Sequence, residues 1–281
     1  MLRQSKPIHQ SWSSALLSND LTASSHIAWP PKYDLIGVQV SKVNYDEAID
    51  CMMQAAKQEK PGIVACHAVH AIVTASCDPE LRSQVNDFAM ITPDGQPVRW
   101  GLNLLHRAGL TDRVYGPELT RRVCHAAARE GVSIYLYGGT PEILELLQTN
   151  FRKEVPNLVI AGAEAPPFRK LTEEENEAAC TRINQSGAGV VMIGLGCPKQ
   201  DFFAAHNRDR INCVQLLVGA AFDFHAGVKP MAPKWMQNWG LEWLFRLLCE
   251  PRRLWQRYLV TNSIYLLRLG TSFIRKPFTA S

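Results

Sequence analysis

The stretch Ser133-Ile-Tyr-Leu-Tyr-Gly-Gly-Thr-Pro-Glu142 carries the local signals that decide the fold. Its Ile-Tyr-Leu-Tyr segment predicts a buried strand, and Gly138-Gly139 predict a tight turn after it. Thr140 is a suitable N-cap and Pro141 suits the first position of a helix. The stretch therefore predicts a strand that passes into a helix through a glycine turn.

The same alternation of strand and helix runs through most of the chain. Strands are expected at residues 35–40, 63–66, 88–92, 133–137, 158–161, 190–193 and 213–218. Helices are expected between them, among others at 45–60, 117–130 and 172–185. Such alternation implies parallel pairing and right-handed crossovers. The predicted fold of residues 34–228 is α/β, a Rossmann-like open and mostly parallel sheet with helices on both faces.

The character of the sequence changes after Gly227. Residues 229–281 predict helices at 235–239, 241–249 and 251–274, and they hold four of the seven tryptophans. They contain nine Lys/Arg and two acids, which leaves 21 basic and 24 acidic residues in the rest of the chain. A tail of net charge +7 on a body of −3 indicates an anionic partner. We expect a separate helical appendage here, and a flexible polar leader over residues 1–33.

Composition also bounds the compartment and the partners. The chain has no uninterrupted run of about 18 apolar residues, so no membrane-spanning helix is predicted. No signal-peptide pattern is seen. The eight cysteines lie singly, without a Cys-x-x-Cys pair, which favours a reducing, cytoplasmic compartment and no metal cluster. Tryptophan, leucine and arginine at helical spacing over residues 242–257 suit a lipid headgroup layer. Lipid is favoured over nucleic acid, because no groove-reading motif is present; a helix packed on the protein surface is the remaining alternative.

Two glycine-rich turns are candidates for binding phosphate. In open α/β sheets, ligands bind at the carboxyl ends of the strands. The turn Gly194-Leu-Gly196-Cys-Pro-Lys199-Gln200 follows a strand and opens a helix. It can offer backbone N–H groups, a helix N-terminus and Lys199 to a diphosphate. Tyr137-Gly138-Gly139 is a second candidate, and both could instead be plain tight turns.

Three further residues are candidates because they follow strands or precede a helix. Asp94 ends an apolar strand between two prolines, where a sheltered carboxylate can act as a general base or only cap the next helix. Arg113 can bind a pyrophosphate bidentately or pair with Asp112. Asp223 can accept hydrogen bonds from a ribose or sugar, or be an ordinary loop carboxylate. His67 and His70 are expected to be structural.

Six blocks of sequence carry a resemblance to a known family. They are Asp94–Trp100, Arg113–Leu119, Tyr135–Glu142, Gly194–Asp201, Gly219–Gly227 and Ala232–Arg253. In this order they resemble the WecG/TagA/CpsF glycosyltransferases, and the similarity extends over residues 34–260. Any one block would be weak, whereas six in order are specific.

The resemblance implies a metal-independent, inverting glycosyltransferase that needs no cofactor. Such enzymes transfer a sugar from a UDP-sugar, often of the N-acetylmannosamine type or a related hexose, to an undecaprenyl-diphosphate-linked saccharide. They act at the inner face of the bacterial membrane in surface or exopolysaccharide synthesis. The resemblance makes Asp94 the general base, and it places Arg113 and Gln200 in the active-site pocket. Arg246 and Arg253 fall in the appendage, which is expected to meet the pyrophosphate.

One departure from the family pattern concerns the donor or acceptor sugar. Many members have Thr-x-Asn where this chain has Cys66-His67-Ala68, so a hydroxyl and an amide that could hold a sugar are absent. The sequence does not identify the donor sugar, the linkage or the oligomeric state, and a homo-oligomer is left open.

Two other functions remain as alternatives. A nicotinamide-dependent oxidoreductase is disfavoured, because no G-x-G-x-x-G follows the first strand. A non-catalytic protein that binds a sugar nucleotide or a lipid would have the same turns without turnover.

Overall fold

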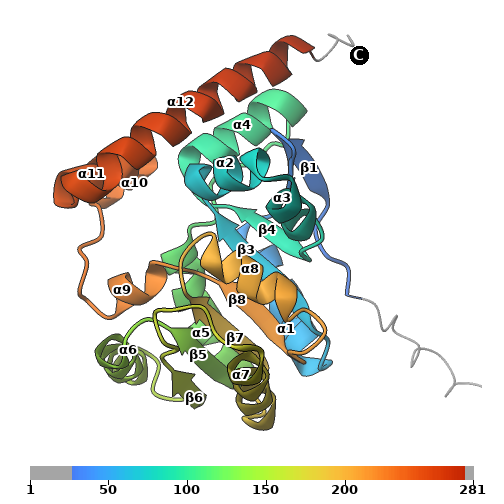
Figure 1. Cartoon of the computed structure of the whole chain (residues 1–281), viewed down its shortest axis with the longest axis vertical. Coiled ribbons are helices and arrows are strands. Elements are labelled where there is room, and N and C mark those ends of the chain that lie inside the picture. Colours follow the sequence, from blue (N-terminus) through green and yellow to red (C-terminus); the bar gives the residue numbers. More distant parts are fainter. Residues whose placement is uncertain (1–26, 276–281) are drawn as a thin grey trace, which may run out of the picture.

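The computed structural model describes residues 27–275 and contains a six-stranded, wholly parallel sheet (Figure 1). Its strand order is β4-β3-β8-β7-β5-β6. The strands are β3 (Gly62–His67), β4 (Met90–Pro93), β5 (Ile134–Gly138), β6 (Ile160–Glu164), β7 (Val190–Gly194) and β8 (Val214–Leu217). This confirms the predicted Rossmann-like fold. Of the predicted leader, residues 1–26 lie outside the described part, and β1 already begins at Lys32.

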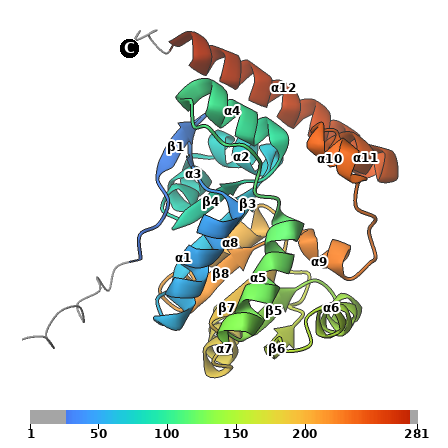
Figure 2. The ribbon, with the colours of Figure 1, turned by 180° about the vertical axis from the view of Figure 1, so that it is seen from behind.

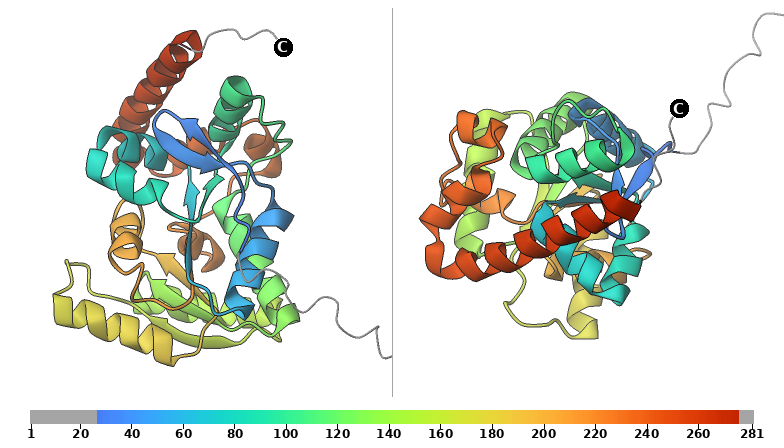
Figure 3. Two further views of the ribbon diagram at one scale, coloured as in Figure 1. Left: turned by 90° about the vertical axis from the view of Figure 1, so that its right-hand side faces the viewer. Right: turned by 90° about the horizontal axis from the view of Figure 1, so that it is seen from above.

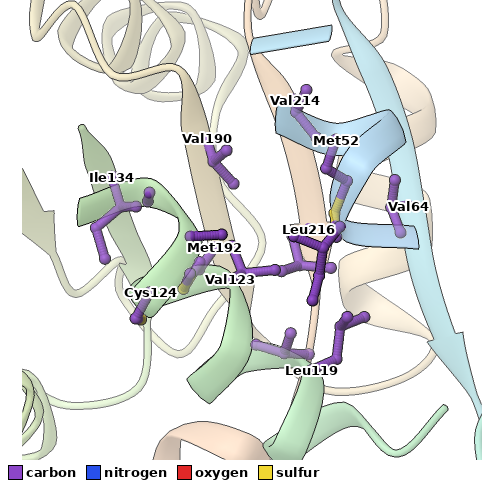
Figure 4. Close-up of a cluster of buried hydrophobic side chains, with 14 of the residues drawn as sticks. Met52, Val64, Leu119, Val123, Cys124, Ile134, Val190, Met192, Val214 and Leu216 are labelled. Atoms are coloured by element: carbon purple, nitrogen blue, oxygen red, sulfur yellow. The ribbon is translucent and has the colours of Figure 1, made fainter. Parts of the chain in front are cut away.

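Helices cover both faces of the sheet, as predicted. One layer holds α1 (Tyr45–Lys57), α5 (Gly116–Glu130) and α6 (Pro141–Glu154), and the other holds α2 (Val69–Cys77), α3 (Pro79–Asn86), α7 (Glu173–Gln185) and α8 (Lys199–His206). Successive strand residues point to opposite faces, so Val64 packs in the first layer and Ile63 in the second. Figure 4 shows the first layer, where Met52 of α1 and Val123 of α5 meet Leu216 of β8.

The structure corrects three predicted elements. The run 35–40 is not one strand but the end of an antiparallel hairpin of β1 (Lys32–Leu35) and β2 (Val38–Ser41). Both turn residues, Ile36 and Gly37, have positive φ, as a tight two-residue hairpin turn requires. Strand β6 begins at Ile160 rather than 158. The segment after β8 contains a short helix, α9 (Ala221–His225), where only a loop was expected.

Helix α4 (Gln96–His106) follows the end of β4 and lies under the C-terminal helices. These are α10 (Lys234–Asn238), α11 (Glu242–Cys249) and α12 (Pro251–Arg275), in the positions expected from the sequence. Helix α12 packs on α2 and α4 and crosses the top of the molecule (Figures 2 and 3). The Tyr265 hydroxyl donates to the Pro97 carbonyl at 2.7 Å, and Arg268 donates to the Ser76 carbonyl at 2.9 Å. None of the described helices is both long and apolar enough to span a bilayer.

Candidate active site

A cavity of about 1210 Å³ opens at the carboxyl edge of the sheet. Residues at the carboxyl ends of β4, β5, β7 and β8 line it, and α11 and α12 contribute further side chains. Ten of the twelve residues predicted for the site line it, namely Asp94, Tyr137, Gly139, Gly194, Gly196, Lys199, Gln200, Asp223, Arg246 and Arg253. The structure thus brings together residues that are far apart in the sequence.

Asp94 is a half-buried carboxylate at the end of β4. Pro93 pairs in register with His67 of β3, so Asp94 lies beside the carboxyl end of the neighbouring strand. Gly95 has a φ of 101°, which lets the chain turn sharply into α4. The Asp94 carboxylate accepts a hydrogen bond from the backbone of Gly116, at the start of α5. Burial raises the pKa of Asp94 to about 6, against the opposing effect of Arg113.

Arg113 is buried close to Asp94 but is engaged by the C-terminal helices. Its guanidinium forms an ion pair with Glu242 of α11 at 2.7 Å and donates to the Gln237 side chain at 3.3 Å. It also lies over the Tyr115 ring, 4.3 Å from the centroid. The arginine is not among the residues that line the cavity. The Arg113 side chain therefore pairs not with Asp112 but with Glu242, 129 positions further along the chain.

The two glycine turns lie against each other at the edge of the sheet. A Cβ at Gly138 would lie 2.7 Å from the backbone carbon of Gly194, and one at Gly194 would lie 2.4 Å from the Phe222 ring. Gly138 therefore permits the close approach of the two turns without lining the cavity itself. Gln200 is buried, and its side-chain oxygen accepts the Gly196 N–H at 3.1 Å. This bond joins the turn to α8, whose first residue is the exposed Lys199.

Tyr137 and Asp223 line the same cavity with different partners. The Tyr137 ring stacks on Phe203 with centroids 4.8 Å apart. Its buried hydroxyl has no hydrogen-bond partner within the described part of the chain. Asp223 forms an ion pair with Lys229 at 2.6 Å, and Lys229 also contacts Glu250 at 3.4 Å. Asp223 is therefore part of an ion-pair network that extends through Lys229 and Glu250 to Arg253.

Three arginines of the C-terminal helices face the cavity: Arg246, Arg253 and Arg257. Arg246 lies over the Phe224 ring at 5.6 Å, and Arg253 pairs with Glu250. Burial lowers the pKa of Arg257, and the neighbouring arginines lower it further. Among residues 27–275, neither Arg246 nor Arg257 has a carboxylate partner. These two cations are thus available to an anionic group in the cavity.

Sequence reasoning did not single out Arg257, and it expected His70 to be structural, although both residues line the cavity. His70 lines the cavity, and burial together with Arg257 lowers its pKa to about 4. His67 does not line the cavity, and its partner was not foreseen. Its Nε2 donates to the Asp201 carboxylate at 2.8 Å, with both side chains 1% exposed. This pair ties the end of β3 to the start of α8, next to the Gly194–Gln200 turn.

No group of three or more metal-ligating side chains occurs within residues 27–275. The cavity is instead defined by one carboxylate with a raised pKa, two glycine turns and a cluster of arginines. This arrangement suits an α/β enzyme that takes a diphosphate-containing substrate and removes a proton beside it. The model of the glycosyl transferase WecG/TagA/CpsF family matches residues 33–278. The chain therefore belongs to this family and is a glycosyltransferase.

Proposed function

We propose that this glycosyltransferase moves a sugar from a UDP-sugar to a polyprenyl-diphosphate-linked saccharide, with inversion at the anomeric carbon. Asp94 takes the proton of the acceptor hydroxyl, whose oxygen attacks the anomeric carbon. The bond from that carbon to the β-phosphate oxygen breaks, and UDP leaves. The observation that carries this proposal is the position of Asp94, a half-buried carboxylate in the same cavity as the Gly194–Gln200 turn and the arginines.

The leaving diphosphate is stabilised in this proposal by protein groups and needs no metal ion. The Gly194–Lys199 turn, with the exposed Lys199 ammonium, meets one side of it. Arg246 and Arg257 meet the other side, where they lack a carboxylate partner among the described residues. Preorganised cations in a sheltered cavity stabilise the charge that develops as UDP departs. The donor sugar is of the N-acetylmannosamine type or a related hexose.

The acceptor is lipid-linked, so we also propose that the enzyme binds peripherally to the inner face of the bacterial membrane. The C-terminal helices carry the cations and exposed tryptophans that suit this place: Trp235, Trp239 and Trp255 are all exposed. Such helices lie in the headgroup layer without spanning the bilayer. The product enters a bacterial surface or exopolysaccharide polymer.

Replacing Asp94 by Asn tests the mechanism. The variant keeps the size of the side chain and the bond to Gly116, but it cannot accept the proton. We expect kcat to fall roughly 10³-fold, with the Kd for UDP unchanged by calorimetry. Glu142→Gln, on the exposed first turn of α6, serves as the matched control and should leave both values unaltered.

Full turnover by the Asp94→Asn variant would remove this carboxylate from the mechanism. A wild-type protein that binds NADH but not UDP would instead refute the proposed donor class. Membership of the family already sets aside the oxidoreductase and the non-catalytic binding protein.

A further inference from the structure

Helix α4 exposes two large apolar side chains although it belongs to the sheet-containing part of the molecule. Trp100 is 46% exposed and Leu104 is 51% exposed. Four residues apart on a helix, they lie on one side of it, one above the other. A single exposed apolar residue is ordinary, whereas a contiguous patch marks a binding surface. Further exposed apolar side chains lie on the C-terminal helices that pack next to α4.

The contact between α4 and α12 shows which flank of α12 lies next to α4. A Cβ on Gly101 would lie 2.4 Å from the Tyr265 hydroxyl and 3.4 Å from the Leu269 side chain. Arg268 instead reaches Ser76 of α2. The flank of α12 that Leu269 marks thus faces α4, and the flank that Arg268 marks faces α2.

The exposed apolar stripe of α12 runs along the flank that faces α4. At roughly 100° per residue, Trp255, Leu259 and Leu266 point to the same side of Tyr265 as Leu269 does. Trp255 is 51% exposed, Leu259 63% and Leu266 66%. Helix α12 passes over α4 (Figure 1), and the two helices are in contact where Gly101 meets Tyr265 and Leu269. The stripe therefore lies on the side of α12 that is next to α4, the helix that carries Trp100 and Leu104.

The junction between α10 and α11 lies next to Trp100 of α4. A Cβ at Gly240 would lie 2.8 Å from the Trp100 ring, so the indole lies directly against this junction. The preceding residue, Trp239, is 74% exposed. We call this set of exposed apolar side chains on neighbouring helices the α4–α12 face; its members are Trp100, Leu104, Trp239, Trp255, Leu259 and Leu266.

The charges around the α4–α12 face select its partner. Residues 95–111 contain no Asp or Glu but include Arg99 and Arg107. Residues 234–275 contain seven Lys/Arg and two acids; three of the arginines line the cavity, which leaves Lys234, Arg252, Arg268 and Arg275 outside it. Both acids are already paired within the protein: Glu242 pairs with Arg113, and Glu250 pairs with Lys229 and Arg253. An apolar face with tryptophans and an unbalanced set of cations fits an anionic phospholipid surface.

We propose that α4 and α12 together form the lipid-contacting surface, so that the sheet-containing part itself touches the bilayer. This inference rests on the membrane role in the proposed function and extends it beyond the C-terminal helices. Helix α4 begins two residues after Asp94. Lipid contact along α4 therefore brings the turn that carries Asp94 to the headgroup layer, where a lipid-linked acceptor presents its sugar.

Vesicle partition of the full-length protein tests this surface. The probe is phosphatidylcholine vesicles containing phosphatidylglycerol, sedimented without any sugar nucleotide. The double variant Trp100→Ser/Leu104→Ser should lower the partition coefficient roughly 10-fold, because two apolar side chains no longer enter the interface. Leu146→Ser is the matched control, since Leu146 is 42% exposed on α6, at the opposite end of the molecule (Figure 1). It should partition like the wild type.

Two outcomes would overturn the inference. One is a double variant on α4 that partitions like the wild type, while Leu259→Ser/Leu266→Ser on α12 loses partition. The other is a wild-type dimer, seen by light scattering, that the α4 variant converts to a monomer with unchanged vesicle binding; the face would then contact a second copy. If the α12 variant also keeps full partition, the proposed membrane role itself fails.

Discussion

At the residue scale, the behaviour of Asp94 follows from its surroundings. The side chain is sheltered at the end of β4, and burial disfavours its charged form. Arg113 opposes this effect, and Glu242 reinforces it. The result is a carboxylate whose pKa of about 6 lies near neutral pH. A base of this strength is ionised at pH 7 and still takes a proton readily.

The pH dependence of transfer should report this carboxylate. Because the base must be ionised, kcat should rise with pH through about 6 and level off above it. Transfer assays from pH 5 to pH 8 would measure this profile. A rate that stays constant down to pH 4.5 would mean that no group with this pKa controls the step.

The same burial has a cost in stability that a mutation can reveal. A raised pKa in the folded state means that the contribution of Asp94 is favourable below its unfolded pKa of 3.8 and is lost as the pH rises through about 6. Asp94→Asn should therefore raise the free energy of unfolding at pH 8 by about 2 kcal/mol. The gain should vanish at pH 4. Urea denaturation at the two pH values measures the difference.

The buried pair His67–Asp201 is a second feature of single residues. Removing the imidazole with His67→Ala leaves the Asp201 carboxylate buried without its partner, which should cost about 3 kcal/mol. Because Asp201 directly follows Gln200, we also expect the UDP affinity to fall. His67→Gln, whose Nε2 can still donate to Asp201, should recover part of both, and calorimetry with urea titration would measure this. Ile183→Ala, in α7, is the control for general destabilisation; an equal loss of UDP affinity there would contradict a local effect.

At the element scale, Gly101 allows α12 to pack closely on α4 of the sheet-containing part. Gly101 lies in the middle of α4, and its missing side chain leaves room for the Tyr265 hydroxyl to reach the Pro97 carbonyl. The buried ion pair between Arg113 and Glu242 likewise attaches α11 to the sheet-containing part. The C-terminal helices are thus fixed by specific contacts rather than by apolar area alone.

Gly101→Ala should loosen α12, because the added Cβ would lie 2.4 Å from the Tyr265 hydroxyl. Overpacking of this kind costs about 1–3 kcal/mol. Hydrogen exchange over α12 should become faster while exchange in β5 and β7 stays slow. Gly270→Ala is the matched control, since no atom lies within 4 Å of the Cβ it would add; helix propensity should make it neutral or slightly stabilising. Equal exchange in both variants would contradict the role assigned to the packing.

At the scale of the whole molecule, positive charge is concentrated at one end. The cations of α10–α12 lie at the end that carries the α4–α12 face, and the acids that balance the overall charge lie elsewhere. Each exposed cation near an anionic leaflet contributes about 1 kcal/mol, and salt screens this attraction. The molecule should therefore approach an anionic surface in one orientation.

Partition into anionic vesicles should decrease steeply as NaCl rises, because the cations are then screened. Partition into purely zwitterionic vesicles should be weak and nearly independent of salt. Sedimentation at several salt concentrations would compare the two. Strong, salt-insensitive binding to zwitterionic vesicles would assign the attachment to apolar contact alone.

The sequence by itself determined the alternation of strands and helices, the Asp94 turn, both glycine turns and the helical C-terminus. These depend on local patterns: side-chain periodicity, turn residues and caps act within a few positions. Local patterns were also wrong at residues 35–40, where the positive φ of Ile36 and Gly37 makes a hairpin.

Only the tertiary structure decided which distant groups meet. It paired Arg113 with Glu242 and His67 with Asp201, brought Arg257 to the cavity, and packed α12 on α4. These contacts join residues more than 100 positions apart, and they depend on the order of the strands and on the packing of whole helices. No periodicity within a single segment encodes such a contact, because the free energy that selects it comes from burying both partners at once.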